Sequence, residues 1–421
     1  MEAEEESGIG GYKLFGMEAD KGRWLLVLIG LIINLCLGAI YSWSVFRAPL
    51  EADFSVGATE SLLPFIIFLA AFAFTMPLAG RPLDKYGPRK LAIIGGALVG
   101  VGWILGSQAG SMEMLAISYG IVGGIGVGIV YNCPICVVGR WFPDRRGLAV
   151  GITVLGFGLS PLVTAPIANS LIDANGSLMA LGIMGVAFLA IIIPLSIPLS
   201  FPPAEYSPAC RNLAVKTSNE GVDRKEMLGK RSFWGLWGCY VIGTLAGLMA
   251  IGISSSVGQE VFELNAATAA LLVGVFAIFN GIGRPIFGSM ADRFSPRNTA
   301  MISFGLITLA ALMLAVGSGP GATAVYVVGF CILWLCLGGW LAIAPTSTAT
   351  FFGSKHYGPN YGTVFTAYGV GAIAGSLLAG NLRDIMGSYT AVFLPVAILG
   401  LVGIVIAFIL MRPPESEESS E

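Results

Sequence analysis

Long apolar runs, separated by short polar segments, recur along the whole chain. Each run is close to the ~20 residues that an α-helix needs to cross the hydrocarbon core of a bilayer. The pattern therefore predicts an all-α integral membrane protein with twelve transmembrane helices. We place these helices at about 23–46, 61–80, 91–108, 114–138, 147–171, 178–200, 233–257, 266–291, 299–318, 323–350, 361–380 and 389–411.

The composition supports a membrane protein and argues against an enzyme. Of the 421 residues, 55% are apolar and only 11% are Asp, Glu, Lys or Arg, whereas a soluble protein carries about 25% of such residues. Twelve helices occupy most of the chain, so a soluble catalytic domain has no place in it. The sequence holds one histidine and no acidic residue deep within the apolar runs. It therefore offers no catalytic or metal-binding cluster, and we expect no cofactor.

The distribution of Lys and Arg predicts the orientation in the membrane. If the helices alternate in direction, twenty of the 23 basic residues fall on the same side as the N-terminus. The opposite side carries two, Arg47 and Arg383, and Arg284 lies within a helix. Because basic residues accumulate on the cytoplasmic side, we expect both termini in the cytoplasm and the protein in the plasma (inner) membrane. One missed helix would invert every later loop, so the asymmetry also supports the number of helices.

Arg284 is the only Asp, Glu, Lys or Arg that falls deep within a predicted helix. It lies eight residues before Asp292, or ~12 Å along a helix, close to the middle of a hydrocarbon core ~30 Å thick. A charge there costs at least ~2.5 kcal/mol, so it is expected to face a water-filled cavity on a substrate path. The alternative is a structural role in an ion pair or with a backbone carbonyl, but no membrane carboxylate is available for an ion pair.

Two segments about half a chain apart are similar. Residues 80–90 read GRPLDKYGPRK and residues 288–297 read GSMADRFSPR. Their aspartates, Asp84 and Asp292, are 208 residues apart. The repeat predicts two pseudo-symmetric bundles of six helices, with a substrate site near the midplane between them, as alternating access requires.

The repeat also predicts the domain boundaries. The N-terminal bundle is expected at 23–200 and the C-terminal bundle at 233–411, joined by a polar cytoplasmic linker at 201–232. Acidic tails at 1–22 and 412–421 are expected to be disordered, because they have too few apolar residues to pack.

The repeated loops, of the form G-x-x-x-D-[RK]-x-x-P-R, resemble the signature loops of the major facilitator superfamily. Other strings narrow the resemblance: RWFPDRRGLA at 140–149, EML at 226–228, FW at 233–234, LW at 236–237, FNG at 279–281, RP at 284–285 and NYG at 360–362. Together they resemble the oxalate/formate antiporter family, a prokaryotic branch related to the monocarboxylate transporters. The resemblance extends from the first predicted helix to the last, and it implies the twelve-helix fold of the superfamily.

The signature loops combine an Asp with several cations near tight turns. We expect them to join cytoplasmic helix ends through charge-assisted hydrogen bonds and so to act in gating. The residues assigned to this role are Gly80, Asp84, Arg89, Arg140, Asp144, Arg145, Gly288, Asp292 and Arg293.

The resemblance implies a substrate site around Arg284. In oxalate carriers an Arg in the eighth helix and a Lys in the eleventh hold the two carboxylates. Arg284 matches the first, whereas the second position is Tyr368, which is uncharged at neutral pH. One buried Arg neutralises one carboxylate, and a second carboxylate would be left unpaired at a cost of several kcal/mol. A small monocarboxylate such as lactate, pyruvate, acetate or formate is therefore favoured over oxalate.

Aromatic and polar residues within the helices complete the predicted site. The family surrounds its small, flat substrates with aromatic side chains, and the matching residues here are Tyr41, Tyr131, Phe157 and Phe365. Trp340 lies beside two positions, Leu337 and Leu341, that are aromatic in oxalate carriers, which indicates a more aliphatic pocket. Polar groups in membrane helices seek water or hydrogen bonds, which adds Asn34, Asn132 and Asn280. For any one aromatic, packing or lipid contact is the alternative.

These features favour a secondary transporter of small monocarboxylates that works by alternating access. Proton-linked relatives commonly carry an Asp one turn before the Arg, where this chain has Asn280. A co-transported proton would therefore travel on the substrate's carboxyl group or on a water chain. The alternative is an oxalate/formate-type organic anion exchanger, which needs no proton site in the protein. The expected partners are the monocarboxylate, a proton and the lipid bilayer, with no nucleic acid and no metal, and we expect a monomer.

Overall fold

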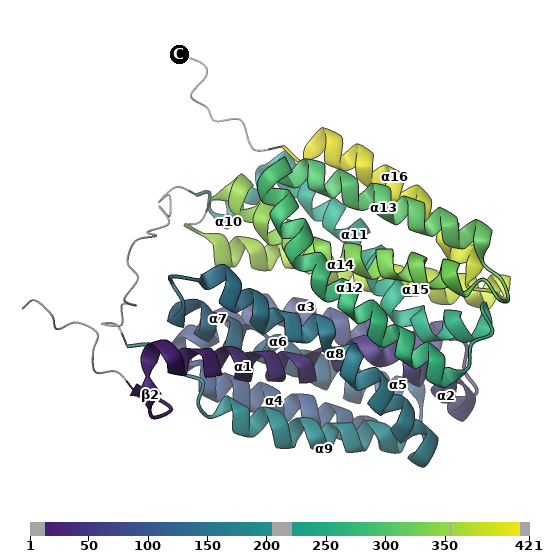
Figure 1. Ribbon diagram of the computed structural model, residues 1–421, viewed down its shortest axis with the longest axis horizontal. Coiled ribbons are helices and arrows are strands. Elements are labelled where there is room, and N and C mark those ends of the chain that lie inside the picture. Colours follow the sequence, from purple (N-terminus) through teal and green to yellow (C-terminus); the bar gives the residue numbers. More distant parts are fainter. Residues whose placement is uncertain (1–12, 204–220, 354, 413–421) are drawn as a thin grey trace, which may run out of the picture.

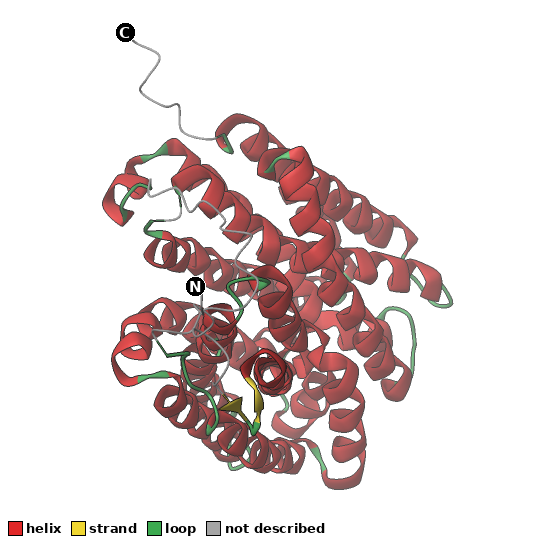
Figure 2. Cartoon of the chain, turned by 60° about the vertical axis from the view of Figure 1, so that its left-hand side comes forward, coloured by secondary structure: helices red, strands yellow, loops and turns green. Residues whose placement is uncertain are grey.

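The computed structural model of the protein describes residues 13–203, 221–353 and 355–412, and these residues are almost entirely helical (Figure 2). Twelve helical spans within them are long and apolar enough to cross a membrane. The number that the apolar runs predict is therefore confirmed. Most of the expected linker and large parts of both expected tails lie outside the described residues.

The N-terminal half begins with a two-stranded antiparallel sheet, β1 (Lys13–Leu14) and β2 (Met17–Glu18). The first span is continuous through three elements, α1 (Ala19–Leu37), the 3-10 helix η1 (Gly38–Ser42) and α2 (Trp43–Phe54). The next elements are α3 (Ala58–Tyr86), α4 (Pro88–Gly106), α5 (Met112–Leu115), the π-helix η2 (Ala116–Gly123), α6 (Gly124–Val130), α7 (Asn132–Trp141), α8 (Arg146–Asn175) and α9 (Ser177–Ser196).

The C-terminal half contains six long helices that follow a short one in the expected linker. These elements are α10 (Arg224–Gly229), α11 (Arg231–Glu260), α12 (Ala266–Phe294), α13 (Pro296–Gly317), α14 (Thr323–Phe352), α15 (Tyr357–Met386) and α16 (Thr390–Leu410).

The two halves lie side by side and meet along two pairs of helices (Figure 1). Helix α3 packs along α15, and α8 packs along α12. Glycines bring α3 and α15 close together: a Cβ atom on Gly380 would lie 2.6 Å from the Cα atom of Thr59, and one on Gly369 would lie 2.8 Å from the Cβ atom of Ala73. Such close approach through small residues is typical of helix packing in membranes.

The two ends of the bundle differ in the chain segments that lie there. The linker end carries α10 and the beginning of α1, and the far end carries the beginning of α3 and the end of α15 (Figure 1). In Figure 1 the two halves lie close together towards the far end and diverge towards the linker end.

The first helix is longer than the apolar run predicted, and this changes the position of Arg47. The run at 23–46 placed Arg47 in a loop, but the helix continues to Phe54 and Arg47 is fully buried. That expectation was wrong because the charge of Arg47 is satisfied within the protein, by Glu51 and Ser61. At the other end, α1 begins at Ala19 and residues 13–18 form the hairpin, within the segment expected as a tail.

The residues assigned to gating lie at or near the linker end, with varied contacts. Asp144 accepts two hydrogen bonds from Arg23, at 2.6 and 3.0 Å, which tie the loop after α7 to α1. The Arg140 guanidinium lies 3.8 Å from the centre of the Phe201 ring. Gly80 lies within α3, Gly288 lies within α12, and the side chain of Asp84 is outside the described part. The remaining four are exposed: Arg89, Arg145, Asp292 and Arg293.

Candidate functional site

Arg284 lies on α12 at the interface between the two halves. Its Nη1 atom donates a hydrogen bond of 2.7 Å to the backbone carbonyl of Val154 on α8. Its Nε and Nη2 atoms are buried and have no hydrogen-bond partner. No Asp or Glu of the described residues forms an ion pair with it. A carbonyl thus takes one side of the guanidinium, and the opposite edge is left with two unused donors.

The unused edge has the geometry that a carboxylate requires. In an arginine, Nε–H and one N–H of Nη2 point in parallel from the same edge of the planar group. Two parallel donors match the two oxygens of one carboxylate. Burial strengthens such charge-assisted bonds, because water does not compete for the donors.

Asn280 lies one turn before Arg284 and adds an unused acceptor beside these donors. Its Nδ2 atom donates to the carbonyl of Trp334 at 3.3 Å, whereas its Oδ1 atom is buried without a partner. Both residues face Gly158 of α8, where a Cβ atom would lie 2.8 Å from Oδ1 of Asn280 and 3.3 Å from Nη2 of Arg284. The Arg donor and the Asn acceptor therefore face the same point of the opposite half.

An aromatic cluster joins the two halves next to Arg284. The hydroxyl groups of Tyr41, in η1, and Tyr368, in α15, share a hydrogen bond of 2.6 Å, although they are 327 residues apart in the chain. Phe157 packs edge-on against Tyr41 and Tyr131, with ring centres 5.1 and 5.4 Å apart. Phe365 stacks on Tyr368 at 5.0 Å. The five aromatics other than Trp340 that the sequence singles out are therefore gathered in one place.

Phenol groups from both halves lie near Arg284. Tyr41 and Tyr131 come from the N-terminal half, and Tyr240 of α11 comes from the C-terminal half. Tyr131 and Arg284 are both half-buried. Tyrosine hydroxyls can donate to an anion without adding charge. The site thus combines one positive charge with neutral donors.

Three predicted residues make their contacts within one half. Asn132 donates to the carbonyl of Met76 at 3.2 Å, and Asn34 donates to that of Gly30 at 2.9 Å. Trp340 stacks on Tyr240 at 6.1 Å, and its ring also lies 5.1 Å from that of Phe304 on α13. It therefore lies behind Tyr240, deeper in the C-terminal half.

Sequence reasoning missed several members of the cluster. Phe72 of α3 lies at its centre, with its ring 5.3 to 5.9 Å from those of Tyr131, Phe157, Phe365 and Tyr368. Trp334 packs on Tyr41 at 6.4 Å, and Tyr240 packs on Phe365 at the same distance. Tyr240 has a polar hydroxyl in an apolar helix, so the rule that selects Asn34, Asn132 and Asn280 also applies to it. Phe72 has no polar group, so nothing in the sequence singles it out.

Comparison with known proteins identifies the family. Residues 24–356 match the family model described as Major Facilitator Superfamily. The chain is 29% identical over 394 residues to the oxalate:formate antiporter of Oxalobacter formigenes, an alignment that covers 93% of this chain and 92% of that protein. It is 26% identical over 403 residues to monocarboxylate transporter 12 of Xenopus laevis, covering 88% of this chain and 85% of that one.

Solved structures share the fold. The chain superposes with a TM-score of 0.70 on a bacterial homolog of the human lysosomal transporter Spinster in an inward-facing and occupied conformation, at 14% identity and with 93% and 97% of the two chains covered. The TM-score with the nucleoside transporter NupG is 0.71, at 14% identity and with 92% and 100% covered. The match to the family model over residues 24–356 shows that this chain belongs to the major facilitator superfamily. It is a multi-pass membrane transporter and not an enzyme, which confirms the predicted fold and class.

Proposed function

We propose that the protein is a secondary transporter of small monocarboxylates, of the lactate, pyruvate, acetate and formate class. The observation that carries this proposal is the buried edge of Arg284, whose Nε and Nη2 atoms have no partner at the interface between the halves. This edge suits one carboxylate. Tyr368 takes the position at which oxalate carriers place a second cation, so a second carboxylate would be left unpaired in the cluster.

Alternating access around this site is the proposed mechanism. The halves, at 23–200 and 233–411, would move as two bodies joined by the segment 201–232, in a monomer. We assign the linker end and both termini to the cytoplasm, because twenty of 23 basic residues lie on that side. We place the protein in the plasma (inner) membrane.

We propose that the monocarboxylate is transported together with a proton, and this coupling can be measured directly. Net entry of a monocarboxylate into proteoliposomes that contain a pH-sensitive dye is expected to acidify the interior. The acidification should be faster than in protein-free liposomes, because the proton enters with the carboxylate. Net lactate uptake without proton movement above that background would contradict coupling and leave the monocarboxylate site intact.

Exchange of organic anions is the second candidate. It is favoured by the neutral Asn280 and by the absence of an ion-paired carboxylate at Arg284 among the described residues, because exchange needs no titratable group in the protein. The relative from Oxalobacter formigenes is named as such an exchanger. Uptake that requires an anion inside the vesicles, and that moves no proton, would favour this alternative.

Asn280 is expected to distinguish 2-hydroxy acids from simple acids. Its Oδ1 acceptor lies beside the unused donors of Arg284, where it can accept a hydrogen bond from a hydroxyl next to the carboxylate. In the variant Asn280→Leu, which keeps the branched shape of the side chain but removes its polar atoms, the affinity for lactate should fall about tenfold. The affinity for acetate, which has no hydroxyl, should change less than about threefold. Competition against labelled substrate gives both values, and an equal loss for the two acids would refute this role.

A further inference from the structure

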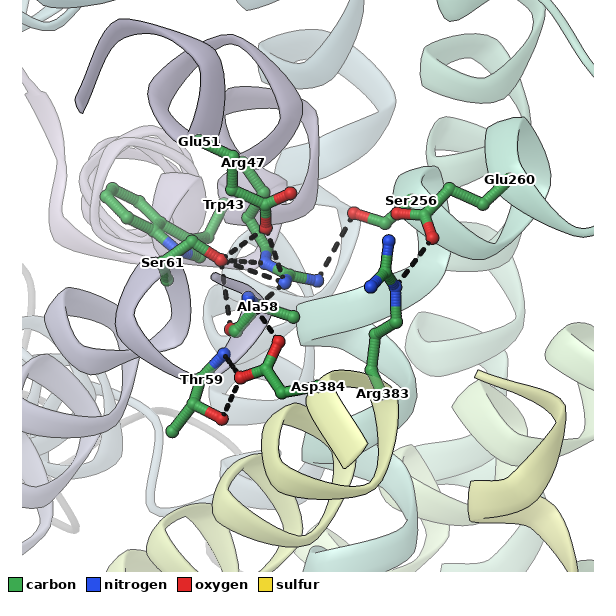
Figure 3. A network of polar contacts seen from close by, with 10 residues as sticks. All are labelled: Trp43, Arg47, Glu51, Ala58, Thr59, Ser61, Ser256, Glu260, Arg383 and Asp384. Atoms are coloured by element: carbon green, nitrogen blue, oxygen red, sulfur yellow. Dashed lines mark hydrogen bonds and ion pairs between the residues drawn. The ribbon is translucent and has the colours of Figure 1, made fainter. Parts of the chain in front are cut away.

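A network of polar side chains joins the two halves at the far end (Figure 3). Its centre is Arg47 of α2, which is fully buried. The Nε and Nη2 atoms of Arg47 donate to Oγ of Ser61 at 3.0 and 2.8 Å, and Nη2 also donates to Glu51 at 2.8 Å. These partners belong to the N-terminal half, so they fix the guanidinium within that half.

One nitrogen of Arg47 reaches across to the other half. Its Nη1 atom donates to Oγ of Ser256 on α11 at 3.2 Å (Figure 3). The guanidinium also lies 5.5 Å from the centre of the ring of Tyr389, which precedes α16. Movement of the halves apart at this end would break both contacts and leave those to Ser61 and Glu51 in place.

A second connection runs in the opposite direction, from the C-terminal half to the beginning of α3. Asp384, near the end of α15, accepts hydrogen bonds from the backbone N–H groups of Ala58 and Thr59, both at 2.9 Å, and from the Thr59 hydroxyl at 2.5 Å. The residue before α3 is Gly57, which has no side chain to cap the helix. The first N–H groups of a helix need acceptors and favour negative charge. Asp384 supplies this cap from the other half.

These two connections differ from a nearby ion pair within one half. Arg383 donates to Glu260 at 2.9 Å, and both residues belong to the C-terminal half (Figure 3). Separation of the halves leaves that pair intact. Asp384 is exposed at the surface, so water can replace its bonds to α3 when they break. A contact of this kind can open and close reversibly, whereas a buried ion pair would resist opening.

We propose that the contacts of Arg47 with Ser256 and Tyr389, together with those of Asp384 with Ala58 and Thr59, form a lock that holds the far end closed. We call these contacts the far-end lock. The lock stabilises the arrangement in which the halves diverge at the linker end, and both connections must break before the far end opens. This role is independent of which acid the protein carries, because none of these residues contacts Arg284.

The distance between the halves at the far end tests the lock. Spin labels are placed at Asn175, the last residue of α8, and at Ala267, at the beginning of α12, in a protein whose seven native cysteines are replaced. Both sites are exposed and belong to different halves. Pulsed electron paramagnetic resonance on the reconstituted protein then gives the populations with short and long separations. Asp384→Asn should raise the ratio of long to short about tenfold, because charge-assisted bonds to α3 are weakened.

Two further variants complete the test. Arg47→Gln should shift the populations in the same direction as Asp384→Asn, and the double variant should shift them further. Glu260→Gln removes the ion pair within one half and only the weakest of the electrostatic contacts of Arg47, so it should shift them much less than Asp384→Asn. Unchanged populations in Asp384→Asn, whose side chain is exposed and not needed for packing, would overturn the proposal. An equal shift in Glu260→Gln would also overturn it, because the effect would then come from general loss of charge at this end.

Discussion

Replacement of Arg284 by lysine is expected to lower monocarboxylate transport between roughly tenfold and 100-fold, although it keeps the positive charge. Lysine offers a single ammonium group in place of the planar edge with two parallel donors. One carboxylate oxygen therefore loses a charge-assisted hydrogen bond, which contributes ~1.5–3 kcal/mol. About 1.4 kcal/mol changes a rate tenfold. The quantity to measure is kcat/KM for uptake of labelled lactate into proteoliposomes.

A matched control separates the geometry of the guanidinium from a general effect of the substitution. Arg231, the first residue of α11, is exposed and remote from the aromatic cluster. Arg231→Lys should transport like the unmodified protein. Unimpaired uptake in Arg284→Lys would remove Arg284 from the substrate site.

Replacement of Tyr368 by lysine is expected to let the site accept a dicarboxylate. Oxalate should inhibit lactate uptake by the unmodified protein only weakly, because Arg284 neutralises one of its two carboxylates and the other is left unpaired in a buried site. A second cation at residue 368 would pair with it. The concentration of oxalate that halves lactate uptake should therefore fall at least about tenfold in Tyr368→Lys.

The variant Tyr368→Phe shows whether the change comes from the added charge. It removes the Tyr368 hydroxyl and its hydrogen bond to Tyr41, but it adds no cation. Its inhibition by oxalate should stay as weak as that of the unmodified protein. If oxalate acts equally on all three proteins, charge matching does not set the preference for monocarboxylates.

The pattern of hydropathy was sufficient to predict the transmembrane helices, because the bilayer restricts the structures that can cross it. A chain that crosses hydrocarbon must satisfy its backbone hydrogen bonds internally, so each long apolar run becomes a helix. The run at 266–291 matches α12 (Ala266–Phe294) closely for this reason. Hydropathy fails where a charged residue is satisfied by protein partners. Arg47 and Glu51 end the first apolar run in the sequence, yet they pair with each other inside a continuing helix.

The candidate site was predictable where a residue was chemically unusual for its surroundings. Arg284 stood out as a charge in an apolar helix, and Asn280 as an amide one turn away. Polarity indicates that a side chain needs a partner, but it does not say on which face of the helix the partner lies. Asn132 is an example: its side chain bonds to the carbonyl of Met76 within its own half and not to a group of the other half. Phe72 is chemically ordinary, and only the packing of α3 against α15 brings it to the centre of the cluster.

The most direct test of the account is a solved structure of the protein with lactate bound. The carboxylate is expected between the two halves, with its oxygens within hydrogen-bond distance of Nε and Nη2 of Arg284, and with the lactate hydroxyl near Oδ1 of Asn280. Lactate bound elsewhere, with the Arg284 guanidinium facing lipid or held only by protein groups, would contradict the account.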